Sequence, residues 1–168
     1  RKAIWKRLLR WATPPKPWRP LNNVRIFAGI MKFDHYTSYS EVITNHAGKV
    51  LASLWGALEN YRHGMVLIGG LVPRFICSGN MNTTLLRPVT LDVDLGISVA
   101  VDGDMSPIDW KLRALGYRED QKEGGRFIAD IDGIRIPIDF LTEHVHPTSS
   151  IEIAGIRASN LLGVKRAI

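Results

Sequence analysis

The chain has 168 residues, of which 45% are hydrophobic and 23% charged, and this balance excludes a disordered or fibrous protein. Its single cysteine, Cys77, cannot form an internal disulfide, and no apolar stretch approaches the roughly 18 residues of a membrane span. We therefore expect a globular protein of a reducing compartment, the cytoplasm, with no transmembrane segment.

The net charge of +6 comes from the N-terminus. Residues 1–20 contain seven Lys or Arg and no acidic residue, which leaves 15 basic and 16 acidic residues in the remainder. Apolar residues at helical spacing among these cations, followed by four prolines, predict a basic amphipathic arm and Pro-rich linker over residues 1–22. In the favoured interpretation, the arm packs on its own domain, residues 23–168. In the alternative, it contacts anionic lipid or nucleic acid.

The first predicted helix spans residues 38–63. Its apolar residues recur on one helix face, and Ser38 and Glu41 have the spacing of a capping box. A short apolar strand over 65–68 follows and ends at Gly69-Gly70.

A polar loop over residues 77–90 separates this half of the domain from the second. The elements expected after it are a strand over 91–101, a helix between Ser106-Pro107 and Gly116, a β-hairpin of residues 126–131 and 134–140 around Asp132-Gly133, a short strand over 151–156 and a helical start at 161–168. This order predicts an α+β fold, a small mixed β-sheet with flanking helices.

Three carboxylates are the candidate catalytic residues. Asp92 and Asp94 are two apart on a predicted strand, so both side chains face one side, and such a pair suits Mg²⁺ or Mn²⁺. Asp139 is the lone charge in an apolar strand. Because Pro137 has no backbone N–H, it predicts that this strand lies at the edge of the sheet, or that residue 137 occupies a position where no N–H is needed for strand pairing. Taken alone, Asp92 and Asp94 are more often solvent-facing residues of a half-exposed strand, and Asp139 is more often a strand end or the partner of an arginine. The three carboxylates together with Gly69-Gly70, a turn whose backbone amides can approach phosphate oxygens, favour a catalytic site.

The order LIGG, TLDVDL, PIDFL over residues 65–141 resembles the nucleotidyltransferase superfamily, the DNA polymerase β-like fold. The resemblance implies that Gly69 and Gly70 seat a nucleoside triphosphate. It also implies that Asp92 and Asp94 bind the metals, with Asp139 as the third carboxylate.

Arg87 and Thr90 before the Asp pair, together with the closing LLGVKRAI, are similar to the AbiEii-like branch, which includes toxins of toxin-antitoxin pairs. This likeness implies nucleotide binding by Arg87, Thr90 and Lys165, and an antitoxin protein as partner. It also implies a helical C-terminal domain beyond residue 168, so we expect the domain to be truncated. Pro73 departs from the family pattern, because it interrupts the short helix expected after the glycines.

These residues predict a metal-dependent nucleotidyltransferase that moves a nucleoside monophosphate from a triphosphate to a hydroxyl of RNA, such as tRNA, or of protein. Two alternatives stay open: a catalytically silent module of this fold that binds nucleic acid or a protein partner, and a nonfunctional fragment of a larger toxin-like gene. His144 and His146 have no nearby third ligand, so we expect surface residues there rather than a zinc site.

Overall fold

The computed structural model describes residues 41–76, 90–98, 107–145 and 148–168. The predicted arm over residues 1–22, Ser38, Cys77, Arg87 and His146 lie outside this part of the chain. Among the described residues, no helix has both the length and the apolar character needed to cross a membrane.

The long helix predicted from the apolar spacing is present as α2 (Glu41–Ala57). It does not run to residue 63, because the chain tightens after Ala57 into a 3-10 helix, η2 (Glu59–Gly64). The predicted apolar face is correct: Val50, Leu51, Leu54 and Leu58 are all buried.

The strand and glycine turn that follow are also as predicted. β1 (Met65–Ile68) ends in η3 (Gly69–Leu71), which continues directly into α3 (Val72–Ile76). The short helix therefore forms despite Pro73, which lies in its first turn, where the missing N–H would have no helical partner.

β2 (Val93–Ile97) is shorter than the strand predicted over 91–101. Asp92 lies just before the strand rather than on it, and residues beyond Ser98 lie outside the described part.

The predicted helix and hairpin are confirmed. α4 is Ile108–Ala114, β4 is Phe127–Ile131 and β5 is Ile134–Thr142. Asp132 and Gly133 both have positive φ, as a two-residue hairpin turn requires. A two-residue strand, β3 (Arg118–Glu119), lies where only a loop was expected and pairs with the start of β4.

The single strand predicted over 151–156 is wrong, because that segment is a second hairpin. β6 (Ser150–Ile153) and β7 (Ile156–Asn160) are joined by Ala154-Gly155, both at positive φ. The final helix forms as one short turn, α5 (Val164–Ala167).

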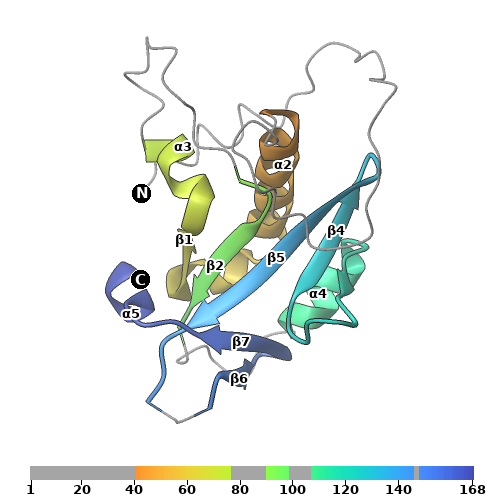
Figure 1. Ribbon diagram of the computed structural model, residues 1–168. Coiled ribbons are helices and arrows are strands. Elements are labelled where there is room, and N and C mark those ends of the chain that lie inside the picture. Colours follow the sequence, from red (N-terminus) through yellow and green to blue (C-terminus); the bar gives the residue numbers. More distant parts are fainter. Residues whose placement is uncertain (1–40, 77–89, 99–106, 146–147) are drawn as a thin grey trace.

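The strands form one mixed sheet, in which β1-β2-β5-β4-β3 are successive neighbours and β7, paired with β6, also joins β5 (Figure 1). β5 is therefore central, so the edge position considered for Pro137 is wrong; parallel pairing with β2 begins one residue later, at Ile138. The other side of β5 is divided between two partners. β4 pairs with it up to Ile138, and β7 pairs with it from Leu141.

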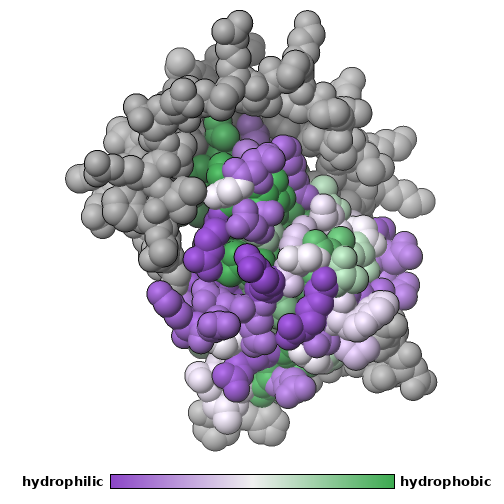
Figure 2. Space-filling model, turned by 90° about the vertical axis from the view of Figure 1, so that its right-hand side faces the viewer, coloured by the Kyte–Doolittle hydropathy of each residue, from purple (hydrophilic) through white to green (hydrophobic). Residues whose placement is uncertain are grey.

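One face of the sheet forms the hydrophobic core, where alternate residues of β2 and β5 are buried against α2: Val93, Leu95, Ile97, Ile136, Ile138 and Phe140. Asp94 and Asp139, which alternate with these residues, are only partly buried and lie on the other face. On the side of β4 and α4, Figure 2 shows a mostly hydrophilic surface with smaller hydrophobic areas in it. The sheet thus presents its acidic residues on the face opposite α2.

Candidate active site

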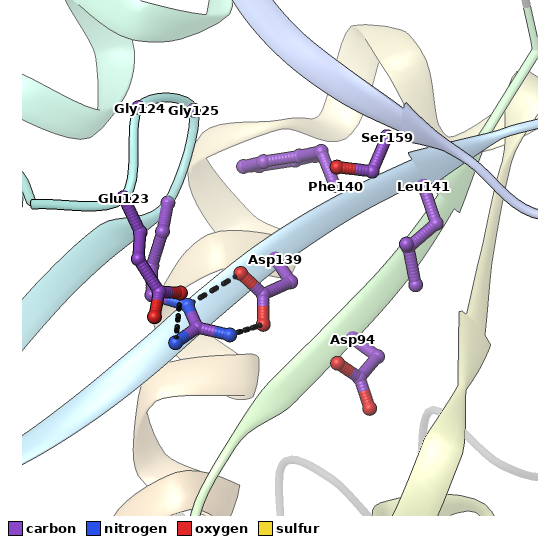
Figure 3. Close-up of a pocket in the computed structure, with 9 residues that line it drawn as sticks. Asp94, Glu123, Gly124, Gly125, Asp139, Phe140, Leu141 and Ser159 are labelled. Atoms are coloured by element: carbon purple, nitrogen blue, oxygen red, sulfur yellow. Dashed lines mark hydrogen bonds and ion pairs between the residues drawn. The ribbon is translucent and has the colours of Figure 1, made fainter. Parts of the chain in front are cut away.

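Asp94 and Asp139 lie side by side on adjacent parallel strands. The register of β2 and β5 pairs Asp94 directly with Asp139, so both side chains leave the same face of the sheet (Figure 3). Two predicted carboxylates, 45 residues apart in the sequence, are thereby neighbours.

Gly69 lies against Asp94. The register of β1 and β2 pairs Ile68 with Asp94, and the chain turns at Gly69 with a φ of +73°. A Cβ at Gly69 would overlap Asp94 Oδ2. The glycine is required here because the carboxylate fills the space that any larger residue would use.

Asp92 is held by a chain of contacts that starts on α2. The Thr44 hydroxyl donates to the carbonyl of Thr90 and accepts from its N–H, both at 3.3 Å. The Thr90 hydroxyl in turn donates to Asp92 Oδ1. A Cβ at Gly70 would lie 2.8 Å from Thr90, so the second glycine gives Thr90 room as the first gives Asp94 room. Thr90 is thus buried and bonded to Asp92, and its predicted contact with a nucleotide stays a prediction.

The pKa of Asp94 is raised from 3.8 to about 7. Burial is the main cause, followed by the negative charges of Asp92 and Asp139, while Arg126 acts in the opposite direction. A nearby divalent cation would relieve both the burial cost and the repulsion between the carboxylates.

Arg126 binds both oxygens of Asp139. Its Nε donates to Oδ1 at 2.8 Å and its Nη2 donates to Oδ2 at 2.7 Å, while Nη1 lies 2.5 Å from Glu123 Oε2 (Figure 3). The bond to Asp139 is the main reason why the pKa of Arg126 is raised. The third predicted carboxylate is therefore already paired with a cation from the chain itself.

A pocket of about 230 Å³ opens beside Asp139. It lies where β4 and β7 separate along β5, and Glu123, Gly124, Gly125 and Ser159 line it together with Asp94 and Asp139. One wall of the pocket is formed by the acidic side chains of Asp94 and Asp139, and Asp94 also lies against Gly69 of the glycine turn. The other wall is the loop before β4.

Lys165 lies on α5, and α5 packs on the acidic face of the sheet. Val164 is buried there, and a Cβ at Gly96 would lie 3.0 Å from its side chain. Glu143 Oε2 accepts hydrogen bonds from the N–H groups of Gly163 and Lys165, at 2.9 and 3.2 Å. The exposed Lys165 thus belongs to a helix on the same face of the sheet as Asp94, but it does not line the pocket.

A metal site of three or more His, Cys, Asp or Glu side chains is absent from the described residues. Asp139 does not belong to a ligand set in this arrangement, because Arg126 holds both its oxygens. Asp92 and Asp94 remain as a pair of hard oxygen donors, and Mg²⁺ is commonly held by one or two carboxylates completed by substrate phosphates and water. Asp92 and Asp94 could hold a divalent cation of this kind, and the role of Asp139 as a third ligand stays a prediction.

His144 is buried, contrary to the surface position expected for it, and His146 lies outside the described residues.

Sequence reasoning missed three residues that organise the site: Arg126, Thr44 and Glu143. Arg126 was predictable. The two-residue turn at Asp132-Gly133 sets a register that places residue 126 across from residue 139, where opposite charges attract. No comparable signal marks Thr44 or Glu143, whose partners are backbone groups distant in the sequence.

No protein-family model, curated protein or solved structure matches the chain. The function is therefore argued from the geometry of the site.

Proposed function

We propose that this protein is a nucleotidyltransferase of the AbiEii-like kind, dependent on Mg²⁺ or Mn²⁺. It would transfer a nucleoside monophosphate from a triphosphate to a hydroxyl of RNA or of protein, in the cytoplasm. The observation that carries the proposal is the adjacency of Asp94, Asp139 and Gly69, which brings two carboxylates and a glycine turn together from three segments.

In the proposed reaction, the acceptor oxygen bonds to the α-phosphorus of the triphosphate. The bond from that phosphorus to the bridging oxygen breaks, and pyrophosphate leaves with the electron pair. Asp139, which faces the pocket, takes the proton of the acceptor hydroxyl when Arg126, which binds both its oxygens in this structure, releases it. The glycine turn at Gly69-Gly70 binds the phosphates, and Lys165 on the same face of the sheet neutralises part of their charge.

Asp92 and Asp94 would hold the divalent cation. When bound, Mg²⁺ or Mn²⁺ supplies positive charge that stabilises the phosphate oxygens as negative charge develops on them. Thr90 keeps the Asp92 carboxylate directed through its hydroxyl, and Gly69 allows Asp94 to stay close to the turn.

A second candidate is a catalytically silent module that binds nucleic acid or a protein partner such as an antitoxin. The pairing of Arg126 with Asp139 favours it, because one of the three acids is neutralised within the chain. The two candidates differ in what they require of Asp94. Transfer needs its charge, whereas binding by the basic arm over residues 1–22 does not.

The deciding experiment is incubation of the folded protein with each α-labelled nucleoside triphosphate, Mg²⁺ or Mn²⁺, and either total RNA or cell lysate. We expect label transfer from one or more triphosphates, and its loss in Asp94→Asn. Asp130→Asn is the matched control, because Asp130 is an exposed aspartate on β4 and should keep full transfer. A folded protein that transfers no label to either acceptor would leave the binding module as the better account.

A further inference from the structure

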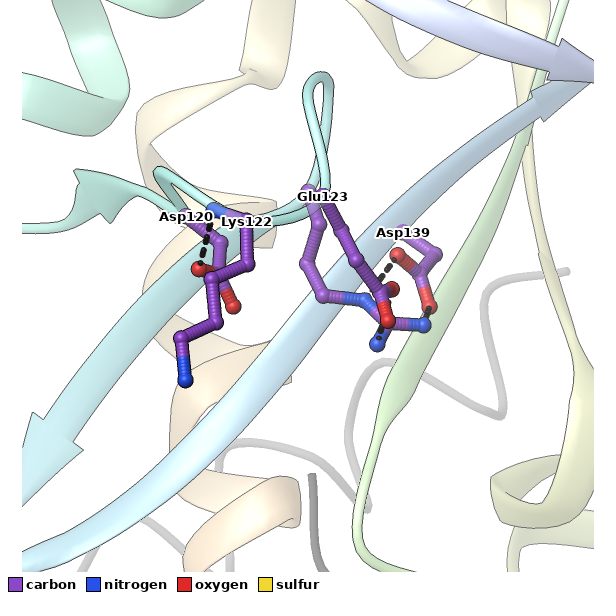
Figure 4. Close-up of polar contacts among 5 residues, drawn as sticks. Asp120, Lys122, Glu123 and Asp139 are labelled. Carbon is purple, nitrogen blue, oxygen red and sulfur yellow. Dashed lines mark hydrogen bonds and ion pairs between the residues drawn. The ribbon is translucent and has the colours of Figure 1, made fainter. Parts of the chain in front are cut away.

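The guanidinium of Arg126 is shared between two acids. Asp139 binds it through two hydrogen bonds of 2.8 and 2.7 Å, and Glu123 binds its third nitrogen at 2.5 Å (Figure 4). The Arg126 and Asp139 side chains are 19% and 22% exposed, so solvent screens this pair less than an ordinary surface ion pair.

The loop before β4 fixes the origin of the Arg126 side chain. The N–H of Asp120 donates to the carbonyl of Arg126 at 2.7 Å, and the N–H of Arg126 donates to the carbonyl of Glu123 at 3.1 Å. Gly125 packs so closely on Arg157 of β7 that a Cβ there would lie 2.8 Å from its carbonyl oxygen. The backbone is thus held at both ends, and only the side chain of Arg126 is left to move.

Asp139 lies between a second carboxylate and a guanidinium on its face of the sheet. Its neighbour in the register is Asp94, the carboxylate that fits a divalent cation, and the guanidinium lies on its other side. A cation that bridges Asp94 and Asp139 would compete with the two bonds from Arg126 for the Asp139 oxygens, because two positive groups on one carboxylate repel each other.

We propose that Arg126 competes with the divalent cation for Asp139 and moves onto Glu123 when the cation takes this carboxylate. The inference rests on the proposed function, because it takes Asp94 as a cation ligand. Arg126 is accordingly a positioning residue: it holds Asp139 in place without a metal, and Glu123 retains the arginine on the pocket wall afterwards.

The test measures binding of Mn²⁺ to the whole chain by electron paramagnetic resonance of the free ion, and its effect on the melting temperature. In Arg126→Gln we expect at least about a tenfold gain in Mn²⁺ affinity, since the competing pair is removed. Without metal this variant should melt at a lower temperature than wild type, and Mn²⁺ should raise its melting temperature by more.

Three further variants separate competition from a general effect. Arg126→Lys keeps the charge but loses the two-pronged contact, so its Mn²⁺ affinity should be intermediate. Arg126→Gln combined with Asp139→Asn should lose the gain. Arg135→Gln, which removes an exposed arginine of β5, should match wild type.

Equal Mn²⁺ affinity in wild type, Arg126→Gln and Arg126→Lys, with binding abolished by Asp94→Asn, would overturn the inference and leave the proposed function in place. Absence of Mn²⁺ binding from all of them would overturn both. If Arg126→Gln does not fold, Arg126→Lys decides: an affinity equal to that of wild type rejects the competition.

Discussion

Substitution of Asp94 by asparagine should stabilise the metal-free protein at neutral and alkaline pH. Asp94 is ionised there at a cost, because it is partly buried beside Asp92 and Asp139, and its pKa is raised from 3.8 to about 7. The shift corresponds to about 4 kcal/mol at about 1.4 kcal/mol per pKa unit. Solvent screening of a partly exposed side chain reduces this, and we expect a gain of roughly 2 kcal/mol in the free energy of unfolding at pH 8.

The gain should depend on pH in one direction. The folded protein keeps the Asp94 proton up to about pH 7, whereas the unfolded chain releases it near 3.8. The folded state therefore binds more protons between these values, and the wild type loses stability as pH rises through this window. The asparagine of the variant cannot ionise, so the two proteins should be equally stable near pH 4 and differ fully at pH 8.

Urea unfolding followed by circular dichroism, in EDTA and at several pH values, measures this difference. Asp130→Asn, at an exposed position on β4, is the control and should change stability little. Addition of Mn²⁺ at pH 8 should raise the stability of wild type more than that of Asp94→Asn. A variant that is less stable than wild type at pH 8, or equally so at every pH, would refute the account of Asp94 as a carboxylate ionised at a cost.

Two further substitutions test the supports of the site. Gly69→Ala should destabilise the protein by about 1 kcal/mol more than Gly116→Ala, because both glycines have positive φ but only a Cβ at Gly69 would meet Asp94. Thr44→Val should cost about 1–3 kcal/mol in the free energy of unfolding and weaken Mn²⁺ binding, because it leaves the buried backbone groups of Thr90 without their hydroxyl partner.

The control for Thr44→Val is Thr142→Val, which removes another buried hydroxyl, one that donates to the carbonyl of Ile97 at 2.7 Å. It should lower stability and leave Mn²⁺ affinity unchanged. An equal loss of Mn²⁺ affinity in both variants would show that general destabilisation accounts for the effect, rather than loss of the contacts that link Thr44 through Thr90 to Asp92. Likewise, equal stability of Gly69→Ala and Gly116→Ala would contradict close packing at Gly69.

Local patterns in the sequence predicted most of the elements correctly. The apolar spacing of α2 and the Asp132-Gly133 turn of the first hairpin are short-range signals, and both elements are present. Strand ends were less predictable. β2 begins at Val93 instead of Leu91: β1 ends opposite Asp94, and pairing with β5 starts at Val93, opposite Ile138 and just after Pro137.

The second hairpin shows why a local pattern can mislead. Residues 151–156 contain three isoleucines, which favoured one continuous strand. The turn at Ala154-Gly155 is stabilised by contacts from elsewhere: the carbonyl of Ala154 accepts the N–H of Ile108, and Gly155 lies against Asp109. Such long-range contacts are not visible in a six-residue window.

For the site, the sequence indicated the acids and left open an arginine as the partner of Asp139, without identifying Arg126. The spacing of Asp92 and Asp94 and the later Asp139 followed from strand periodicity and the family pattern. The partner of Asp139 depends on the register of the first hairpin, which was predicted without being used to pair side chains. The set of three metal-binding acids stays a prediction; in the structure Arg126 binds both oxygens of Asp139.

The division of one side of β5 between β4 and β7 has a mechanical consequence. Residues 139 and 140 fall between the two ladders, so the hairpins on either side are joined there by β5 and by the packing of Gly125 on Arg157, without strand pairing between β4 and β7. A molecule that touched both the Gly124-Gly125 loop and Ser159 would act as a clasp between them. Occupancy of the pocket should therefore slow amide exchange in both hairpins together and make the two halves of the sheet unfold as one unit.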